Sequence, residues 1–168
     1  MKIKNDLIIE NAIKDALDRP EGKVGWTNSP FEPLINHKNA KGDFGELCFK
    51  YYSDSINDHA KIIRKGHDVI TKSNKKVEVK TAFKSKAGSF FFNQIYYEDQ
   101  ETGDNKDWDH LVFVFVEPFK IEMWQCKRPD NPEKHFRINN GWSWNRSSSA
   151  KLDENLWSKI YERDYEQC

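Results

Sequence analysis

The sequence predicts an α/β domain built around a mixed β-sheet. Apolar residues repeat at helical spacing up to about residue 53, whereas between residues 77 and 83 they alternate with polar residues, as in a strand with one covered face. Residues 110–116 form the most apolar run of the chain, which is typical of a strand covered on both faces in the middle of a sheet. Helical and strand patterns that follow one another in this order indicate helices packed on a sheet.

The expected elements follow one another without an internal repeat. We expect two helices separated by an irregular connection, over residues 6–17 and from about 39–43 to 53. Short strands are expected at 61–64 and 68–71, and longer ones at 77–83, 110–116 and 120–126. Periodicity does not decide the state of residues 89–97. Residues 127–149 are expected to form a loop, followed by a final helix over 152–165.

The composition is that of one folded domain. Of the 168 residues, 37% are hydrophobic, 32% charged and 14% aromatic. A chain of this size buries about 70% of its unfolded surface, and the isolated cysteines argue against a disulfide framework. No apolar run approaches the ~20 residues of a membrane-spanning helix, and the N-terminus lacks the apolar stretch of a secretory signal. We therefore expect a cytoplasmic protein with one domain over residues 1–168 and no membrane partner.

The formal net charge is zero, but the charges are unevenly distributed along the chain. Residues 61–86 contain nine Lys or Arg and two acids, whereas residues 98–109 contain six acids and one lysine. Such an asymmetry either creates a basic face for a polyanion or reflects solvated lysines on a hairpin. The charge pattern alone does not decide between these interpretations.

Two carboxylates and a lysine come close together in the expected strands. Side chains two residues apart in a strand point to the same face, so Glu78 and Lys80 project together. If the strand ending near residue 71 pairs antiparallel with the next one, the indices of opposed residues have a constant sum. An even sum, 146 or 148, places Asp68 opposite Glu78 or Lys80, whereas an odd sum moves Asp68 to the other face. The sequence permits the even sum without determining it.

An arrangement of this kind suits phosphodiester hydrolysis. Carboxylates bind hard divalent cations such as Mg²⁺, which polarise a phosphodiester and lower the pKa of an attacking water. A lysine ammonium positions that water or stabilises the charge of the transition state. The alternative is an exposed hairpin with ordinary Glu–Lys cross-strand pairs, because a Glu-x-Lys tripeptide is common in so charged a chain.

These residues occur in an order that resembles the PD-(D/E)XK nuclease superfamily of restriction-endonuclease-like proteins. A helix with Gly45-Glu46 precedes Asp68, and Glu78-Val79-Lys80 and then Gln94 follow it. The resemblance covers roughly residues 40–126 and implies an αβββαβ core with a central mixed sheet flanked by helices. It divides the domain into an N-terminal helical arm and irregular connection (1–38), a nuclease core (39–126) and a C-terminal loop and helix (127–168). The residue before Asp68 is histidine and not the proline of the motif.

The resemblance implies that Asp68, Glu78 and Lys80 are the catalytic residues. The cofactor would be Mg²⁺, with Mn²⁺ as a substitute, and its ligands would be Asp68, Glu78 and the backbone carbonyl of Val79. Glu46 is a further candidate ligand, although helical spacing places it opposite the centre of the apolar stripe of its helix.

Four other residues are candidates for contacting DNA or for supporting the site. Gln94 and Tyr97 resemble the Gln-x-x-Tyr element of RecB-like nucleases. Lys84 and Lys86 continue the direction of the active strand, so they are either backbone-phosphate contacts or solvated lysines.

The expected function is that of a Mg²⁺-dependent endodeoxyribonuclease, of the type II restriction class, that acts on DNA as a homodimer. One site cuts one strand, so two-fold symmetry would match a duplex cut. The alternatives are a Holliday-junction resolvase or DNA-repair nuclease and, from another class, a non-catalytic nucleic-acid-binding module. The fold alone does not choose among them.

Overall fold

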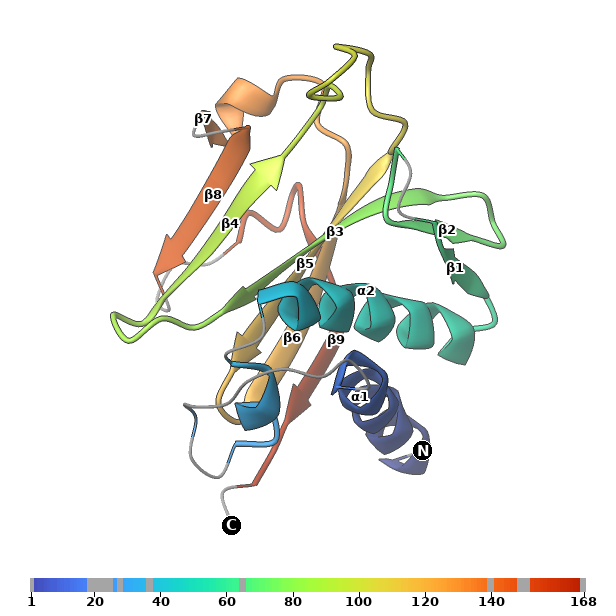
Figure 1. Cartoon of the computed structure of the whole chain (residues 1–168), viewed down its shortest axis with the longest axis vertical. Helices are drawn as coiled ribbons and strands as arrows, with labels where there is room; N and C mark the ends of the chain where they lie inside the picture. Colours follow the sequence, from blue (N-terminus) through green and yellow to red (C-terminus); the bar gives the residue numbers. More distant parts are fainter. Residues whose placement is uncertain are drawn as a thin grey trace.

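A six-stranded mixed sheet forms the centre of the structure (Figure 1). The computed structural model describes residues 2–17, 26, 29–35, 38–63, 66–138, 141–147 and 152–166. The strands lie in the order β1 (Ala60–Ile62), β2 (Val69–Thr71), β3 (Lys76–Phe83), β5 (His110–Glu117), β6 (Lys120–Lys127) and β9 (Ser158–Asp164). β3 and β5 are parallel, and the other neighbours are antiparallel. The predicted α/β class with a mixed sheet is confirmed.

Both predicted helices are present and lie on one face of this sheet (Figure 1). α1 (Lys2–Leu17) begins earlier than expected, and α2 (Lys38–Ser55) covers the range that the apolar spacing indicates. Their buried residues join the valines of β3 and β5 in one core cluster. A 3-10 turn (Glu32–Leu34) places Leu34 in the same core. Among the described residues, no helix is both long enough and apolar enough to cross a membrane.

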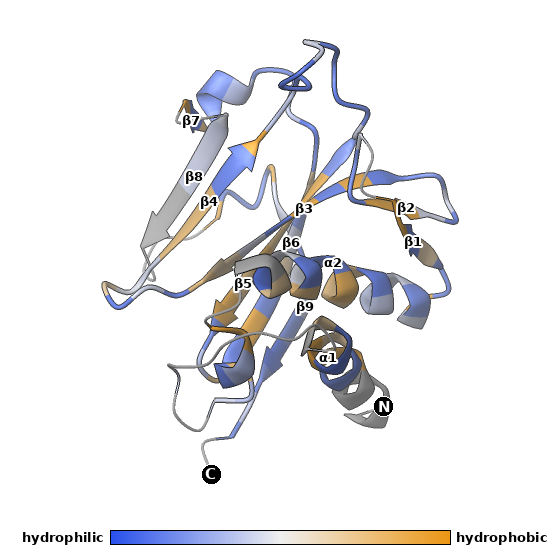
Figure 2. Cartoon of the chain, in the orientation of Figure 1, coloured by the Kyte–Doolittle hydropathy of each residue, from blue (hydrophilic) through white to orange (hydrophobic). Residues whose placement is uncertain are grey.

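β5 lies between two hydrophobic cores, as its continuous apolar sequence predicts. Val112, Val114 and Val116 belong to the core on the helix side. Leu111, Phe113 and Phe115 belong to the core on the opposite side. All six side chains are buried, and Figure 2 shows apolar residues along the central strands and hydrophilic residues in the loops around them.

A second, three-stranded sheet covers the face that the helices leave open. Its order is β4 (Ser89–Ile95), β8 (Trp142–Ser147) and β7 (Arg137–Ile138). The undecided segment 89–97 is therefore largely a strand, which agrees with its aromatic content. Phe92 stacks on Phe113 with a centroid distance of 4.0 Å. The described helices thus flank the central sheet on one face, and the second sheet lies on the other.

The connection between β3 and β5 differs from the core that the resemblance implied. An αβββαβ order requires a helix there, but residues 84–109, all of which the structure describes, contain β4 and a loop and no helix. Phe90, Phe92 and Ile95 of β4 are buried in the second core. A strand rather than a helix forms here because alternate side chains of the segment pack on the central sheet.

Two expectations for the C-terminal part are also wrong. Residues 127–149 are not only loop, since they include a 3-10 turn (Pro132–Lys134), β7 and β8. The expected helix over 152–165 is instead β9, which pairs with β6 from Lys120 to Gln125. The backbone of β9 pairs with the N–H and C=O groups at the outer edge of β6. This pairing with a distant strand outweighs the helical spacing of Leu152, Leu156 and Ile160. Residues 64 and 65, at the end of the first expected short strand, and much of the connection between the two helices lie outside the described residues.

Gly45 determines how closely α2 approaches β3. A Cβ atom at this position would overlap Oγ1 of Thr81, a residue of β3. A side-chain-free residue therefore allows the helix backbone to rest directly on the strand that carries Glu78 and Lys80. At Gly42, one turn earlier in α2, an added Cβ atom would have no neighbouring atom within 4 Å.

We predict that Gly45→Ala destabilises the protein by about 1–3 kcal/mol, because the added methyl group overpacks the contact between α2 and β3. Gly42→Ala is the matched control and should stabilise by up to about 1 kcal/mol through helix propensity. Chemical denaturation measures both. Thr81→Ala should partly restore the Gly45→Ala variant, and equal stabilities of the two alanine variants would contradict this account.

Candidate functional site

The pairing of β2 with β3 brings Asp68 and Glu78 together. Val69 lies opposite Val77 and Ile70 opposite Lys76, so the index sum is 146, one of the two even values. Asp68 comes directly before Val69, outside the residues that pair with β3. The Asp68 N–H donates to the carbonyl of Val77 at 3.0 Å. The N–H of Val79 donates to Oδ2 of Asp68 at 2.8 Å, which holds the carboxylate against β3.

Glu78 and Lys80 form an ion pair on the same face of β3. The Lys80 ammonium lies 2.8 Å from Oε1 of Glu78, whose side chain is 1% exposed. Glu78 and Lys80 lie beside Leu111 and Phe113 of β5, which both face the second core. The pair is therefore on the side of the second sheet, opposite the helices. Removing either partner of a buried ion pair costs about 3–5 kcal/mol.

Lys106 is a fourth member of this cluster, and it was missed by reasoning from the sequence. Its ammonium lies 3.7 Å from Oε1 of Glu78 and 5.7 Å from the ring centroid of Tyr96. Lys106 belongs to the loop between β4 and β5. The signal that could have indicated it is its position as the single basic residue among the six acids of residues 98–109.

Arg128 holds the loop that carries Lys106. Its guanidinium donates to the carbonyls of Lys106 at 2.5 Å, Trp108 at 3.1 Å and Tyr97 at 3.1 Å. It also lies over the rings of Tyr97 and Trp108, 4.4 and 4.5 Å from their centroids. The backbone of Lys106 is thus fixed from a neighbouring strand end, and its side chain enters the cluster from a defined position.

The two carboxylate oxygens of Glu78 have different surroundings. Within the described part of the chain, Oε2 of Glu78 is buried and has no hydrogen-bond partner. Leaving a buried acceptor unpaired is costly. Glu78 Oε1 faces two ammonium groups, whereas Oε2 is available for a cation.

The oxygen atoms of the cluster fit a hard divalent cation. Asp68 accepts the Val79 N–H at Oδ2, so within the described residues Oδ1 is the oxygen through which it would bind a cation. The carbonyl of Val79 points to the same edge of β3 as its N–H, beyond the last residue paired with β2. Among the residues that the structure describes, no three His, Cys, Asp or Glu side chains form a metal cluster. A cation here would therefore be held by two carboxylates, a carbonyl and water, ligands that suit Mg²⁺.

The environment changes the proton affinity of Asp68 and Lys80. Burial raises the pKa of Asp68, and the negative charge of Glu78 raises it further, while Lys80, the Val79 N–H and Lys106 lower it in part. Burial acts to lower the pKa of Lys80, but the charges of Glu78 and Asp68 outweigh it, so its pKa is raised. Lys80 stays protonated, and the ionised form of Asp68 is disfavoured.

Glu46 acts on the cluster from α2 through its charge. α2 places this residue, half-buried, where its negative charge also raises the pKa of Lys80. The spacing argument that set Glu46 away from the centre of the apolar stripe agrees with its partial exposure. Its role as a metal ligand stays a prediction.

The four other candidate residues lie outside the cluster. Gln94 is exposed and occupies the left-handed region (φ 55°) at an irregularity in the pairing of β4 with β8. The Tyr97 hydroxyl donates to the carbonyl of Pro129 at 3.0 Å, so Tyr97 is part of the packing around Arg128. Lys84 forms an ion pair with Glu117 at 2.7 Å, and Lys86 is exposed in the turn after β3.

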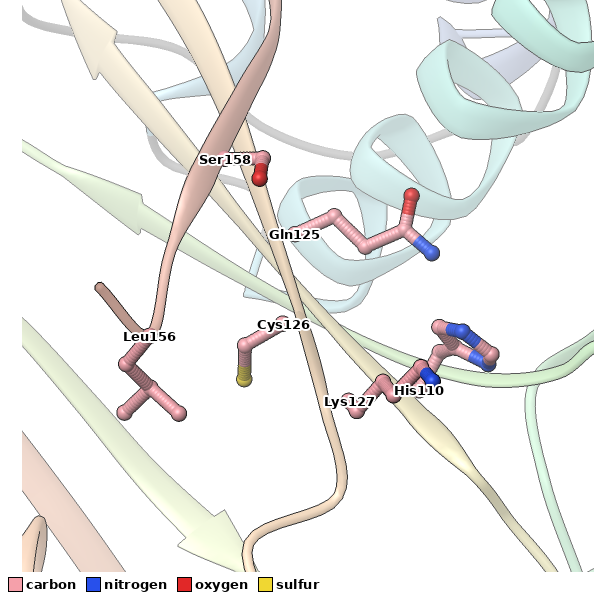
Figure 3. Close-up of a pocket in the computed structure, with 6 residues that line it drawn as sticks. All are labelled: His110, Gln125, Cys126, Lys127, Leu156 and Ser158. Carbon is pink, nitrogen blue, oxygen red and sulfur yellow. The ribbon is translucent and has the colours of Figure 1, made fainter. Parts of the chain in front are cut away.

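A separate pocket lies at the end of β6, where its pairing with β9 stops (Figure 3). Gln125 and Cys126 point to opposite sides of β6 there (Figure 3). The pocket lining includes none of Asp68, Glu78, Lys80 and Lys106. Burial raises the pKa of Cys126 to about 12, so its thiol is protonated and is a poor nucleophile. This pocket offers no chemistry comparable to that of the acidic cluster.

We also compared the chain with known protein families and with curated proteins. No model of a known protein family matches the chain, and no curated protein matches it.

We predict that Asp68→Asn raises the melting temperature at pH 7 in the presence of EDTA. The pKa of Asp68 is higher in the folded than in the unfolded state. Its contribution to stability is therefore fully present below the unfolded pKa and is lost as the pH rises through the folded pKa. The gain should therefore shrink at pH 4. Thermal unfolding at both pH values measures it.

Asp99→Asn is the matched control, because hydrogen bonds from the N–H groups of Thr102 and Glu101 lower the pKa of that exposed carboxylate. It should give no such gain. A melting temperature of Asp68→Asn at pH 7 that equals or falls below that of the wild type would show that ionised Asp68 is not disfavoured.

Proposed function

We propose that this protein is a Mg²⁺-dependent endodeoxyribonuclease, of the type II restriction class, that hydrolyses DNA phosphodiester bonds. The observation that carries the proposal is the cluster of Asp68, Glu78 and Lys80, in which, among the described residues, a buried oxygen of Glu78 has no hydrogen-bond partner. Two carboxylates beside a lysine are the groups that metal-assisted phosphodiester hydrolysis requires. The resemblance of residues 40–126 to PD-(D/E)XK nucleases assigns the same three residues.

Each residue would have a distinct task. Asp68, Glu78 and the Val79 carbonyl would hold Mg²⁺ (or Mn²⁺), which supplies charge stabilisation and a more acidic bound water. Asp68 is oriented by the Val79 N–H. The Lys80 ammonium, protonated because of the two carboxylates, would hold the attacking water or stabilise negative charge on the phosphoryl oxygens. Glu78 keeps Lys80 in position at 2.8 Å.

The distribution of ion pairs favours a sequence-reading enzyme over a nuclease that reads DNA shape alone. Several lysines of the basic segment are paired with acids: Lys75 with Asp58, Lys76 with Asp107 and Lys84 with Glu117. A pure shape reader depends on unpaired cations that contact phosphates. We propose a homodimer as the active form, since two copies of the site would cut both strands. Light scattering of the purified protein tests the dimer.

Incubation with supercoiled plasmid tests the proposed activity. Wild-type protein with Mg²⁺ should give discrete fragments, and EDTA or the variant Glu78→Gln should reduce cleavage by at least about 10³-fold, as expected when a charge-stabilising group is lost. Lys134→Gln, which removes an exposed lysine of the 3-10 turn Pro132–Lys134, is the matched control and should still cleave.

Other outcomes would change the proposal in defined ways. Nicking or smearing that requires both Mg²⁺ and Glu78 would favour a resolvase or repair nuclease, to be tested on branched DNA. DNA binding without any cleavage of plasmid, branched DNA or RNA would replace the enzyme with a nucleic-acid-binding module.

We predict that Lys80→Met abolishes cleavage and also lowers stability, because it leaves Glu78 buried without its closest partner. The loss of stability should be about 3–5 kcal/mol, and the double variant Lys80→Met/Glu78→Gln should recover part of it. Chemical denaturation beside the plasmid assay separates the two effects. Full activity of Lys80→Met would remove Lys80 from the site.

A further inference from the structure

The cluster contains as many ammonium groups as carboxyl groups. Asp68 and Glu78 supply the carboxyl groups, and Lys80 and Lys106 supply the ammonium groups. Lys80 is part of β3 itself and stands two residues from Glu78. Lys106 instead comes from the loop between β4 and β5, 28 residues beyond Glu78, and lies farther from the same oxygen, at 3.7 Å against 2.8 Å. The two lysines are therefore not equivalent partners of Glu78.

A divalent cation that bound at Glu78 and Asp68 would meet a positive charge already in place. Like charges a few ångströms apart repel strongly in a partly buried site. The Lys106 side chain is 22% exposed, so its ammonium has access to solvent when it moves. Tyr96 offers its ring at 5.7 Å, which is a second place for an ammonium group. The backbone of Lys106 need not move, since Arg128 holds its carbonyl.

We propose that Lys106 is a resident counter-ion of the acidic pair, which neutralises Glu78 in the metal-free protein and is displaced when a divalent cation binds. The inference rests on the proposed function, because it takes the acidic pair as the metal site. It assigns Lys106 as a positioning residue that tunes metal affinity. Lys80, closer to Glu78 and on the same strand, stays in place.

Calorimetric titration with Ca²⁺, which has the same charge as Mg²⁺ and prefers the same oxygen ligands, tests the proposal without relying on activity. Lys106→Gln should bind Ca²⁺ at least tenfold more tightly than the wild type, because the competing charge is gone. Lys106→Arg keeps the charge and should bind within about threefold of the wild type. Lys86→Gln makes the same change in net charge on an exposed turn and should also stay within about threefold.

Equal or weaker binding by Lys106→Gln, or an equal gain by Lys86→Gln, would overturn the proposal. If the wild type binds Ca²⁺ and cleaves plasmid but Lys106→Gln gains no affinity for Ca²⁺, the role of Lys106 is rejected and the proposed function is not. Absence of Ca²⁺ binding and of cleavage in every variant would reject the proposed function as well. Tighter binding by Lys106→Gln without any cleavage would support the counter-ion and reject the nuclease.

A second measurement uses the wild-type chain in case Lys106→Gln does not fold. After reductive ¹³C-methylation of lysines, the signal of Lys106, assigned by its absence in Lys106→Arg, should shift when Ca²⁺ is added. The shift should be absent in Glu78→Gln. A Lys106 signal that stays unchanged in protein that binds Ca²⁺ would overturn the displacement.

Discussion

The pairing of two short strands, β2 and β3, is the constraint on which the candidate site depends. Two residue pairs, Val69 with Val77 and Ile70 with Lys76, set the register beside Asp68, whose carboxylate accepts the N–H of Val79. A shift by one residue would turn Asp68 toward the helix-side core, where it would replace an apolar neighbour of Val77 and Val79. Burying a carboxylate without a partner there is costly. Val69, buried in that core, and the bond from the Val79 N–H to Asp68 therefore support the same register.

The cluster on this face is a compromise between stability and chemistry. Two carboxylates are buried beside one another, and among the described residues one oxygen of Glu78 has no hydrogen-bond partner. An apolar replacement would be easier to bury. Such arrangements cost stability, and they are retained where a site requires them. Lys80 and Lys106 limit the cost, because they supply positive charge at Glu78.

The elements that could be predicted are those whose local pattern has a single structural interpretation. α2 follows the spacing of Phe44, Cys48 and their neighbours, and β5 follows from six consecutive apolar residues that no exposed strand would carry. β9 and β4 could not be predicted in this way. β9 forms because the edge of β6 needs a partner, and β4 forms because Phe92 and its neighbours cover Phe113. Both reasons lie in residues far away in the sequence.

The sequence by itself determined that Glu78 and Lys80 share a face, since alternation along a strand is a local property of the backbone. It also determined which strand lies at the centre of the sheet. Only the tertiary structure decided that the register sum is 146, that Lys106 reaches Glu78 and that a second sheet replaces helices on one face. These features depend on contacts between residues many positions apart. Such contacts are set by the packing of the whole chain, which no local pattern encodes.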